Sequence, residues 1–216
     1  MNDAAWQLPA EWEPQSAVLI AWPHAGTDWS ANLADVESTY VALAAAVTRF
    51  QHLLVVVADA DLREHVRTRL AGAGLDMARV HLALADYDDT WLRDSGPITQ
   101  RDGDRFRLLD FRFTGWGGKF GASRDDLLIG ALHANGAFRN ALQDRIDFAL
   151  EGGAIEIDGH GTLMSTLICL QQRHPAMDEA GLCETLGKIF SVAPVVLLKS
   201  GELQGDDTDA HSDTLA

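Results

Sequence analysis

Cysteine is scarce in this sequence, with only Cys169 and Cys183 among 216 residues. They form no Cys-x-x-Cys pair, so the spacing indicates neither a disulfide framework nor a zinc ribbon. The first residues have no basic segment followed by an apolar one, and no signal peptide is predicted. No apolar run approaches the length of a membrane span. We therefore expect a cytoplasmic protein without a membrane partner.

Positively charged residues are also few. The sequence has 17 Lys and Arg residues and 32 Asp and Glu residues, which gives a net charge of −15 at pH 7. Nucleic-acid binding depends on clustered Lys and Arg, so this balance argues against a nucleic-acid partner. Long-range attraction favours a small cationic ligand instead. Hydrophobic residues make up 47% of the chain and charged residues 23%, which is typical of a folded chain of one or two domains.

Motifs for nucleotide or metal binding are missing as well. The glycine-rich stretch 115–120 has Lys119 followed by Phe120 rather than Ser or Thr, and no Gly-x-Gly-x-x-Gly occurs. His24, His174 and the other scattered histidines have no partner at metal-ligand spacing. We therefore expect no cofactor and no bound metal.

What the sequence does contain is an alternation of short apolar runs and amphipathic stretches. Apolar runs predict strands, and apolar residues at helical spacing predict helices. We expect strands at 17–22, 53–58, 80–84, 106–113, 155–158, 162–167 and 194–199, and helices at 34–50, 61–75, 125–139 and 178–190. A turn at 159–161 joins two of the strands in a hairpin. The fold class is therefore α/β, with polar clusters at strand ends, where sites collect in such folds.

The first polar cluster, residues 86–97, places acidic side chains around Arg93 and Trp91. One interpretation is a loop held by an Arg93 ion pair, but it leaves Trp91 and most of the carboxylates without a role. The other is a site for a planar cation, because a carboxylate can bind such a cation in its plane while an indole contacts its face. The residues alone leave both interpretations open.

A second acidic position, Glu151, ends an apolar stretch and is followed by Gly152 and Gly153. It is either an exposed turn residue or a buried carboxylate whose position requires close approach of the backbone. Taken without other observations, the exposed turn is the simpler interpretation.

The third acidic stretch is residues 205–213, which read Gly-Asp-Asp-Thr-Asp-Ala-His-Ser-Asp. If it is extended, Asp207, Asp209, His211 and Asp213 share one face. Three carboxylates around one imidazole repel one another and favour its protonated form, which suits a cationic ligand and a proton shuttle. A solvated acidic tail and a hydrolase that binds a hard divalent cation through these four side chains are the alternatives.

Taken together, these stretches resemble the agmatine deiminase family, which is related to the bacterial peptidylarginine deiminases and to the guanidine-modifying pentein superfamily. The matching stretches run in family order along the chain: 8–14, 21–24, 89–97, 116–120, 150–156 and 205–213. The resemblance implies a pentein-type α/β propeller of pseudo-fivefold ββαβ modules. Residues 1–216 would form the N-terminal part of a single domain, with about three modules.

The resemblance also implies an activity, the hydrolysis of agmatine to N-carbamoylputrescine and ammonia in putrescine synthesis. A guanidinium is planar and permanently charged, so carboxylates must neutralise it before its carbon is attacked. Asp94 and Asp213 would bind its nitrogens. His211 would protonate the leaving ammonia and then activate water, and Glu151 would orient His211. The substrate-binding residues implied on the same basis are Trp91, Asp89, Trp116, Asp207 and Asp209.

The chain departs from the family pattern at the nucleophile. In the family this is a cysteine thiolate in a glycine-rich motif well beyond the His-x-Asp stretch. Neither Cys169 nor Cys183 lies in such a motif, so we expect both to be core thiols and the 216-residue chain to be inactive by itself. Ala210 and Ser212 also replace a usual glycine and a usual aliphatic residue, and residues 171–175 differ from a normally Asn-rich loop.

Two further alternatives stay open on these residues. One is a peptidylarginine deiminase, which acts on a protein arginine, and the other is a guanidinium-binding protein without catalytic activity. An incomplete propeller would leave strand edges and apolar faces uncovered. That predicts association, for example into a homo-oligomer, or a mobile C-terminal stretch.

Overall fold

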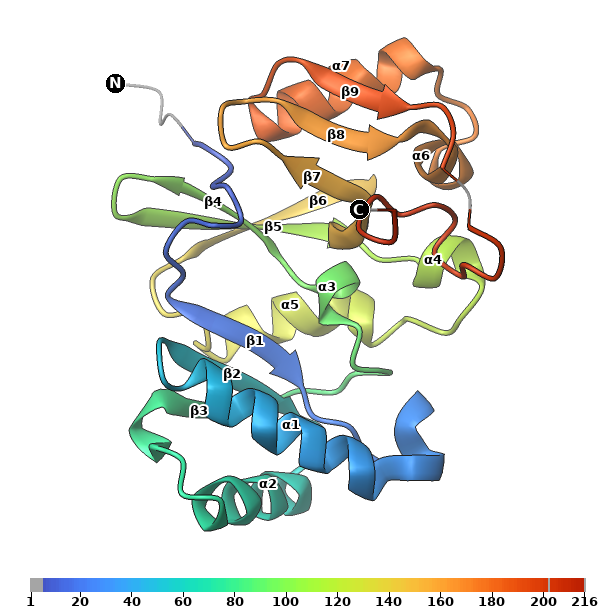
Figure 1. Ribbon diagram of the computed structural model, residues 1–216. Helices are drawn as coiled ribbons and strands as arrows, with labels where there is room; N and C mark the ends of the chain where they lie inside the picture. The colour runs from blue at the N-terminus through green and yellow to red at the C-terminus, as the bar shows by residue number, and fades with distance from the viewer. Residues whose placement is uncertain (1–5, 202, 216) are drawn as a thin grey trace. The chain divides into compact units, whose positions relative to one another are not determined.

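The computed structural model describes residues 6–201 and 203–215 (Figure 1). They divide into two compact units. The one-sheet unit comprises residues 14–92 and 122–139, and the two-sheet unit comprises the described parts of residues 1–13, 93–121 and 140–216. Each of the three small sheets has three strands. The expected α/β class is confirmed at this level.

The one-sheet unit contains a parallel sheet in the order β1-β2-β3, formed by β1 (Ala17–Ala21), β2 (His52–Val57) and β3 (Val80–Leu84). Parallel neighbours need crossover connections, and helices supply them here. The helices of this unit are the 3-10 helix η1 (Asp28–Asn32), α1 (Leu33–Val47), α2 (Ala60–Gly72), the 3-10 helix η2 (Met77–Arg79) and α5 (Asp125–Ala134). Residues 53–57 are all buried, as expected of a central parallel strand.

The two-sheet unit repeats one topology. In the first sheet, β4 (Ile98–Asp102) and β5 (Arg105–Arg112) are antiparallel, and β6 (Leu142–Ala149) pairs parallel with β5. In the second, β7 (Ile155–Ile157) and β8 (Leu163–Thr166) are antiparallel, and β9 (Val195–Leu198) pairs parallel with β8. The helical segments assigned here are α3 (Leu92–Ser95), α4 (Gly115–Gly118), the 3-10 helix η3 (Gly152–Ala154), α6 (Leu167–Arg173) and α7 (Glu179–Phe190).

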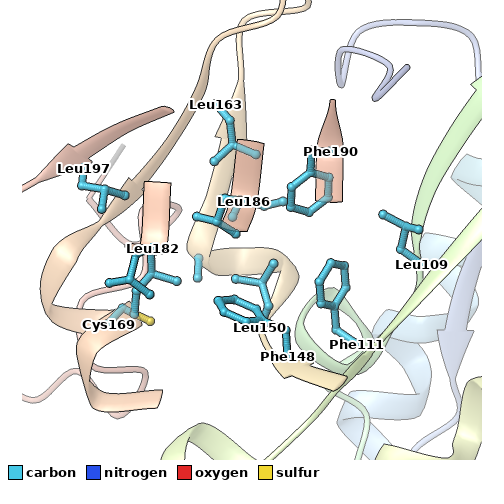
Figure 2. Packing of buried hydrophobic residues seen from close by; sticks show 13 residues of the cluster. Leu109, Phe111, Phe148, Leu150, Leu163, Cys169, Leu182, Leu186, Phe190 and Leu197 are labelled. Carbon is cyan, nitrogen blue, oxygen red and sulfur yellow. The ribbon is translucent and has the colours of Figure 1, made fainter. Parts of the chain in front are cut away.

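A single hydrophobic core holds the two-sheet unit together (Figure 2). Leu182, Leu186 and Phe190 from α7 are fully buried, and the Phe190 ring stacks on Phe111 of β5 with centroids 5.6 Å apart. Leu150, which directly precedes Glu151, lies in the same core. Burial of Leu150 therefore fixes the position of the backbone next to Glu151.

The predicted elements are present, with shifted bounds. The helix predicted at 125–139 was too long, because α5 ends at Ala134 and the left-handed residues Gly136 (φ 77°) and Arg139 (φ 52°) follow. The short helical segments α3, α4, η2 and η3 were not predicted, and neither were β4, β6 and α6. β4 and β6 carry charged residues along much of their length, and α6 follows β8 without a break, with Thr166 as its N-cap. No helix among the described residues is long and apolar enough to cross a bilayer.

Candidate active site

Three buried polar side chains meet in the two-sheet unit. Asp94 lies on α3, Glu151 follows β6, and His211 lies in the segment after β9, with exposed fractions of 9%, 1% and 1%. The His211 Nδ1 atom is 3.5 Å from Asp94 Oδ1, and its Nε2 atom is 3.8 Å from Glu151 Oε2. The imidazole therefore lies between two carboxylates.

Gly153 is the backbone point on which this cluster converges. Its N–H donates to Asp94 Oδ1 over 3.1 Å, and its carbonyl accepts from the backbone N–H of Asp213 over 3.2 Å. A Cβ atom at this position would lie 2.6 Å from Asp94 Oδ1, 2.6 Å from Asp213 Oδ2 and 2.7 Å from His211 Nδ1. Only glycine leaves room for the three side chains. The buried alternative for Glu151, which requires close backbone approach, is confirmed, and the exposed turn is wrong.

Trp116 and Asp213 complete the cluster. The indole N–H of Trp116 donates to Asp94 Oδ2 over 3.0 Å, and Trp116 itself has a left-handed backbone with φ 54°. The Asp213 side chain is 34% exposed, and its Oδ2 atom lies 3.8 Å from Nε of Arg93. One carboxylate of the cluster is thus buried and the other reaches solvent.

Arg173, at the end of α6, binds the Glu151 side of the cluster, and this role was not predicted from the sequence. Its fully buried guanidinium donates to Glu151 Oε1 over 2.9 Å, to Asp209 Oδ2 over 2.9 Å and to the Thr208 carbonyl over 3.0 Å. A buried arginine needs such partners, because an unpaired charge is costly away from water. The signal that could have revealed it is an arginine three residues beyond the apolar run 167–170.

The segment 205–213 is not extended, so the prediction that four of its side chains share one face is wrong. The Asp206 carboxylate accepts from the backbone N–H groups of Thr208 and Ala210 over 2.8 and 2.7 Å, which folds the segment into a turn. Asp209 and Ala210 have φ of 66° and 68°. His211 and Asp213 consequently face the cluster, and Asp209 does not.

Asp209 instead forms ion pairs with two cations, one of which also contacts the backbone of Asp207. The Asp209 carboxylate binds Arg173 and Lys119, and the backbone carbonyl of Asp207 accepts from Lys119 Nζ over 2.7 Å. The metal-hydrolase alternative required Asp207, Asp209, His211 and Asp213 to gather as ligands. Within residues 6–201 and 203–215, the metal-compatible group is a different one, Glu151, Cys169 and His211.

The pKa values of the two buried carboxylates, Asp94 and Glu151, are shifted in opposite directions. Burial raises the pKa of Asp94, and the nearby His211 and the hydrogen bonds from Trp116 and Gly153 offset this only in part. Burial also acts to raise the pKa of Glu151, but the neighbouring His211 and Arg173 outweigh it and lower that pKa below its usual value. Glu151 is therefore the anionic partner, and Asp94 takes up a proton more readily.

The other two predicted residues, Asp89 and Trp91, lie in the one-sheet unit. The Asp89 carboxylate accepts from the backbone N–H groups of Asp28 and Thr90 over 3.0 and 2.7 Å. Trp91 is 40% exposed and packs against Trp29 with ring centroids 5.6 Å apart. Burial and hydrogen bonding thus fix the carboxylate, while the indole presents part of its ring to solvent.

The ion pair that the loop interpretation assigned to Arg93 exists, but its partners lie outside residues 86–97. Arg93 pairs with Glu11 over 2.8 Å within the two-sheet unit. The loop around Asp89 is held instead by Asp125, whose Oδ1 accepts from the backbone N–H groups of Asp88 and Asp89 over 2.7 and 3.3 Å. Asp125 begins α5 and is 5% exposed.

The two cysteines have the surroundings of structural thiols. Cys169 is fully buried in the core of Figure 2, and Cys183 is half-buried against the same core. Burial and the neighbouring Glu151 raise the pKa of Cys169 to about 12, so its thiol stays protonated near neutral pH. The expectation that both are core thiols is confirmed.

Comparison with known proteins reveals extensive similarity. The family model of the Porphyromonas-type peptidyl-arginine deiminases matches residues 7–216. The agmatine deiminase of Pseudomonas aeruginosa (strain LESB58) is 34% identical over 217 residues, which cover 96% of this chain and 56% of the relative. The agmatine deiminase of Stutzerimonas stutzeri (strain A1501) is 32% identical, with the same two shares. The chain thus spans little more than half the length of these relatives.

Solved structures give a concordant result. The C. jejuni agmatine deiminase with substrate bound superimposes with a TM-score of 0.86 at 29% identity, over 97% of this chain and 60% of that one. The agmatine deiminase of Enterococcus faecalis has a TM-score of 0.82 at 27% identity, over 96% of this chain and 56% of that one.

Proposed function

The chain belongs to the Porphyromonas-type peptidyl-arginine deiminase family, and from this premise we propose that it is the guanidinium-binding part of an agmatine deiminase. The reaction of the whole enzyme would convert agmatine and water to N-carbamoylputrescine and ammonia. The observation that carries the proposal is the convergence of Asp94, His211 and Asp213 at Gly153. Two carboxylates beside an imidazole have the charge and the geometry that a planar cation requires.

Asp94 and Asp213 would bind the guanidinium nitrogens. Their nearest carboxylate oxygens are each 2.6 Å from the point where a Gly153 side chain would begin, so they border the same small space. Trp116 supports this role, because its indole N–H fixes one Asp94 oxygen and leaves the other for Gly153 N–H and the ligand. Binding a cation would in turn favour the ionised form of Asp94.

His211 would carry the proton, with Glu151 as the residue that positions it. Glu151 Oε1 is bound by Arg173, and Oε2 faces His211 Nε2 at 3.8 Å. An anionic partner behind an imidazole stabilises the imidazolium that forms when the ring takes up a proton. His211 could then protonate the departing ammonia and activate the water that follows.

The remaining predicted binding residues would act at longer range. Asp209 and Asp207 would act through Lys119 and Arg173 rather than by touching the guanidinium. Asp89 and Trp91 of the one-sheet unit stay predicted cation-binding residues, because a carboxylate beside an indole suits a cation.

We propose a pentein propeller as the fold of the whole protein, with the described residues as part of a single deiminase domain. The repeated topology of the β4-β5-β6 and β7-β8-β9 sheets, a hairpin followed by a parallel strand, supports a modular architecture. Association into a homo-oligomer stays a prediction, which sedimentation of the purified chain would test.

The nucleophile is the part of the mechanism that the described residues do not supply. Cys169 is fully buried and protonated near neutral pH, and the thiol of Cys183 lies 3.8 Å from the Val195 carbonyl beside the core. The inactivity of the 216-residue chain therefore stays a prediction. Ammonia release from agmatine by the purified chain, abolished in His211→Ala, would contradict it.

Calorimetry with agmatine tests the proposed site without requiring turnover. We expect measurable binding to the chain and at least about tenfold weaker binding to Asp213→Asn, because one charged contact to the guanidinium is lost. Asp104→Asn is the matched control, since Asp104 is an exposed acid of the same unit. Equal affinity of the two variants would refute the proposed role of Asp213.

The same assay separates the two family substrates. An agmatine deiminase site should prefer free agmatine to an arginine flanked by peptide bonds. The curated relatives named above are agmatine deiminases, which supports the small substrate. Tighter binding of a blocked arginyl peptide than of agmatine would favour the peptidylarginine deiminase alternative.

A further inference from the structure

Two buried polar atoms of the two-sheet unit face each other without a hydrogen-bond partner among the described residues. They are Glu151 Oε2 and His211 Nε2, separated by 3.8 Å. Each residue is only 1% exposed. A buried carboxylate oxygen and a buried ring nitrogen normally find a partner, because leaving them unpaired costs free energy.

A third ligand-type side chain lies in the same place. Glu151, Cys169 and His211 can each offer one ligand atom such that all three atoms lie within 4.8 Å of one another. Cys169 comes from α6, so three separate parts of the chain contribute. Metal ligands at about 2.0–2.3 Å from a tetrahedral ion are roughly 3.3–3.8 Å apart, so small side-chain movements would bring these atoms to bonding distance.

The group of Glu151, Cys169 and His211 and the proposed guanidinium site use opposite edges of the His211 imidazole. Nδ1 of His211 faces Asp94, whereas Nε2 faces Glu151. Oε1 of Glu151 is already taken by Arg173, which leaves Oε2 for a further partner. An ion bound at Nε2 and Oε2 would therefore not replace Asp94 or Asp213.

We propose that Glu151, Cys169 and His211 form a binding site for one borderline-soft divalent cation of the zinc type. The ligand set of one thiolate, one imidazole and one carboxylate matches the preferences of Zn²⁺ and excludes hard ions such as Mg²⁺ and Ca²⁺. Binding forms a metal–sulfur bond and releases the Cys169 thiol proton to solvent. A fourth position is left for a water molecule.

The consequence for catalysis rests on the proposed function. A metal on Nε2 removes His211 as a proton carrier, so the ion would act as an inhibitor and not as a cofactor. Because the guanidinium carboxylates lie at the other edge of the ring, inhibition would not require the substrate to leave.

Cobalt titration of the chelator-treated 216-residue chain tests the site directly. A Co²⁺–thiolate bond gives a near-ultraviolet charge-transfer band, which should saturate at one equivalent and disappear when Zn²⁺ displaces the cobalt. Cys169→Ser should lose the band. Cys183→Ser, which alters the other thiol and none of the proposed ligands, should retain it.

The opposite results overturn the inference. These are no band in the wild-type chain, a band that survives in Cys169→Ser, or one that disappears in Cys183→Ser. Cys169→Ala is the second variant if serine disturbs the apolar surroundings, with near-ultraviolet circular dichroism as the folding control. The metal-free Cys169→Ser chain should bind agmatine with unchanged affinity, so failure of the metal site and failure of the guanidinium site are distinguishable.

Discussion

At the scale of single residues, Gly153 is the position of the candidate site at which an added Cβ atom would meet three functional side chains at once. Its backbone holds Asp94 and Asp213, while its missing side chain provides the space between them and His211. Sequence alone indicated close approach near Glu151, but the three side chains that approach come from segments far apart in the chain. Which atoms meet at a glycine is a property of tertiary structure.

Gly153→Ala should abolish agmatine binding, because the new methyl group would lie within 2.7 Å of three functional side chains. We expect an affinity loss of at least about 100-fold by calorimetry, together with destabilisation of about 1–3 kcal/mol from overpacking. Gly121→Ala is the control, since nothing lies within 4 Å of a Cβ atom there. Wild-type affinity in Gly153→Ala would contradict this account of the site.

Asp125 gives a pH-dependence prediction in the one-sheet unit. Burial raises the pKa of Asp125 to about 6, above the unfolded value of 3.8; the backbone N–H groups of Asp88 and Asp89 act against this shift, whereas their carboxylates add to it. Stability should therefore be highest while Asp125 is protonated and should fall as pH rises from about 4 to 6. Asp125→Asn can still accept both backbone hydrogen bonds, so we expect it to gain about 2 kcal/mol at pH 7.5 and to lose that pH dependence.

Urea denaturation at several pH values checks the Asp125 prediction. Asp104→Asn, at an exposed turn, is the control and should leave the profile unchanged. If Asp125→Asn is less stable than wild type at pH 7.5, the negative charge itself is needed to hold the loop around Asp89.

At the scale of elements, α6 connects the core to the candidate site. Its apolar face contributes Cys169 and Leu170 to the core, and its last residue, Arg173, binds Glu151 and the segment that carries His211. The helix was missed because a single strand prediction, 162–167, ran into it. The N-cap of Thr166, which ends β8 and begins α6, decides the boundary.

Arg173→Lys should destabilise the chain, because one ammonium cannot replace three directed hydrogen bonds in a buried position. We expect a loss of about 2–4 kcal/mol in the free energy of unfolding. In Arg112→Lys the altered cation belongs to an exposed pair with Asp147, so the change should stay below about 0.5 kcal/mol. Similar denaturation midpoints for both variants would show that the Arg173 contacts contribute little.

At the scale of the whole molecule, the net charge of −15 is the dominant electrostatic feature. Acidic residues lie in both units, and Asp94, Glu151 and Asp213 of the candidate site are among them. Such a field attracts cations from a distance, and salt screens it. The ligand class expected from composition and the ligand class expected from the site are therefore the same.

Agmatine affinity should fall as salt is raised, and more steeply than the affinity for N-carbamoylputrescine, which has one positive charge fewer. Raising ionic strength from about 0.01 to 0.15 M shortens the Debye length from about 30 to 8 Å, so the long-range part of the attraction is lost. Calorimetry at the two ionic strengths measures the difference. Equal salt dependence of the two ligands would mean that only contacts in the site matter.

Local sequence patterns were sufficient to predict several elements of this protein. The apolar run at 53–57 had to be a buried strand, the run at 80–84 had to be a strand, and Asp178 had to begin a helix, while the acidic excess predicts a cationic ligand. These outcomes depend on composition and periodicity over a few residues, which short-range physics controls.

Which acidic side chains lie together depends on long-range packing and not on local sequence. The turn around Asp206 sends His211 and Asp213 toward Asp94 and sends Asp209 toward Arg173, against the alternation that an extended chain would impose. The strands β4 and β6 are likewise stabilised by pairing with β5 rather than by their own charged sequences. Buried charges pair with oppositely charged residues that are distant in the sequence, so a local sequence pattern cannot predict these pairs.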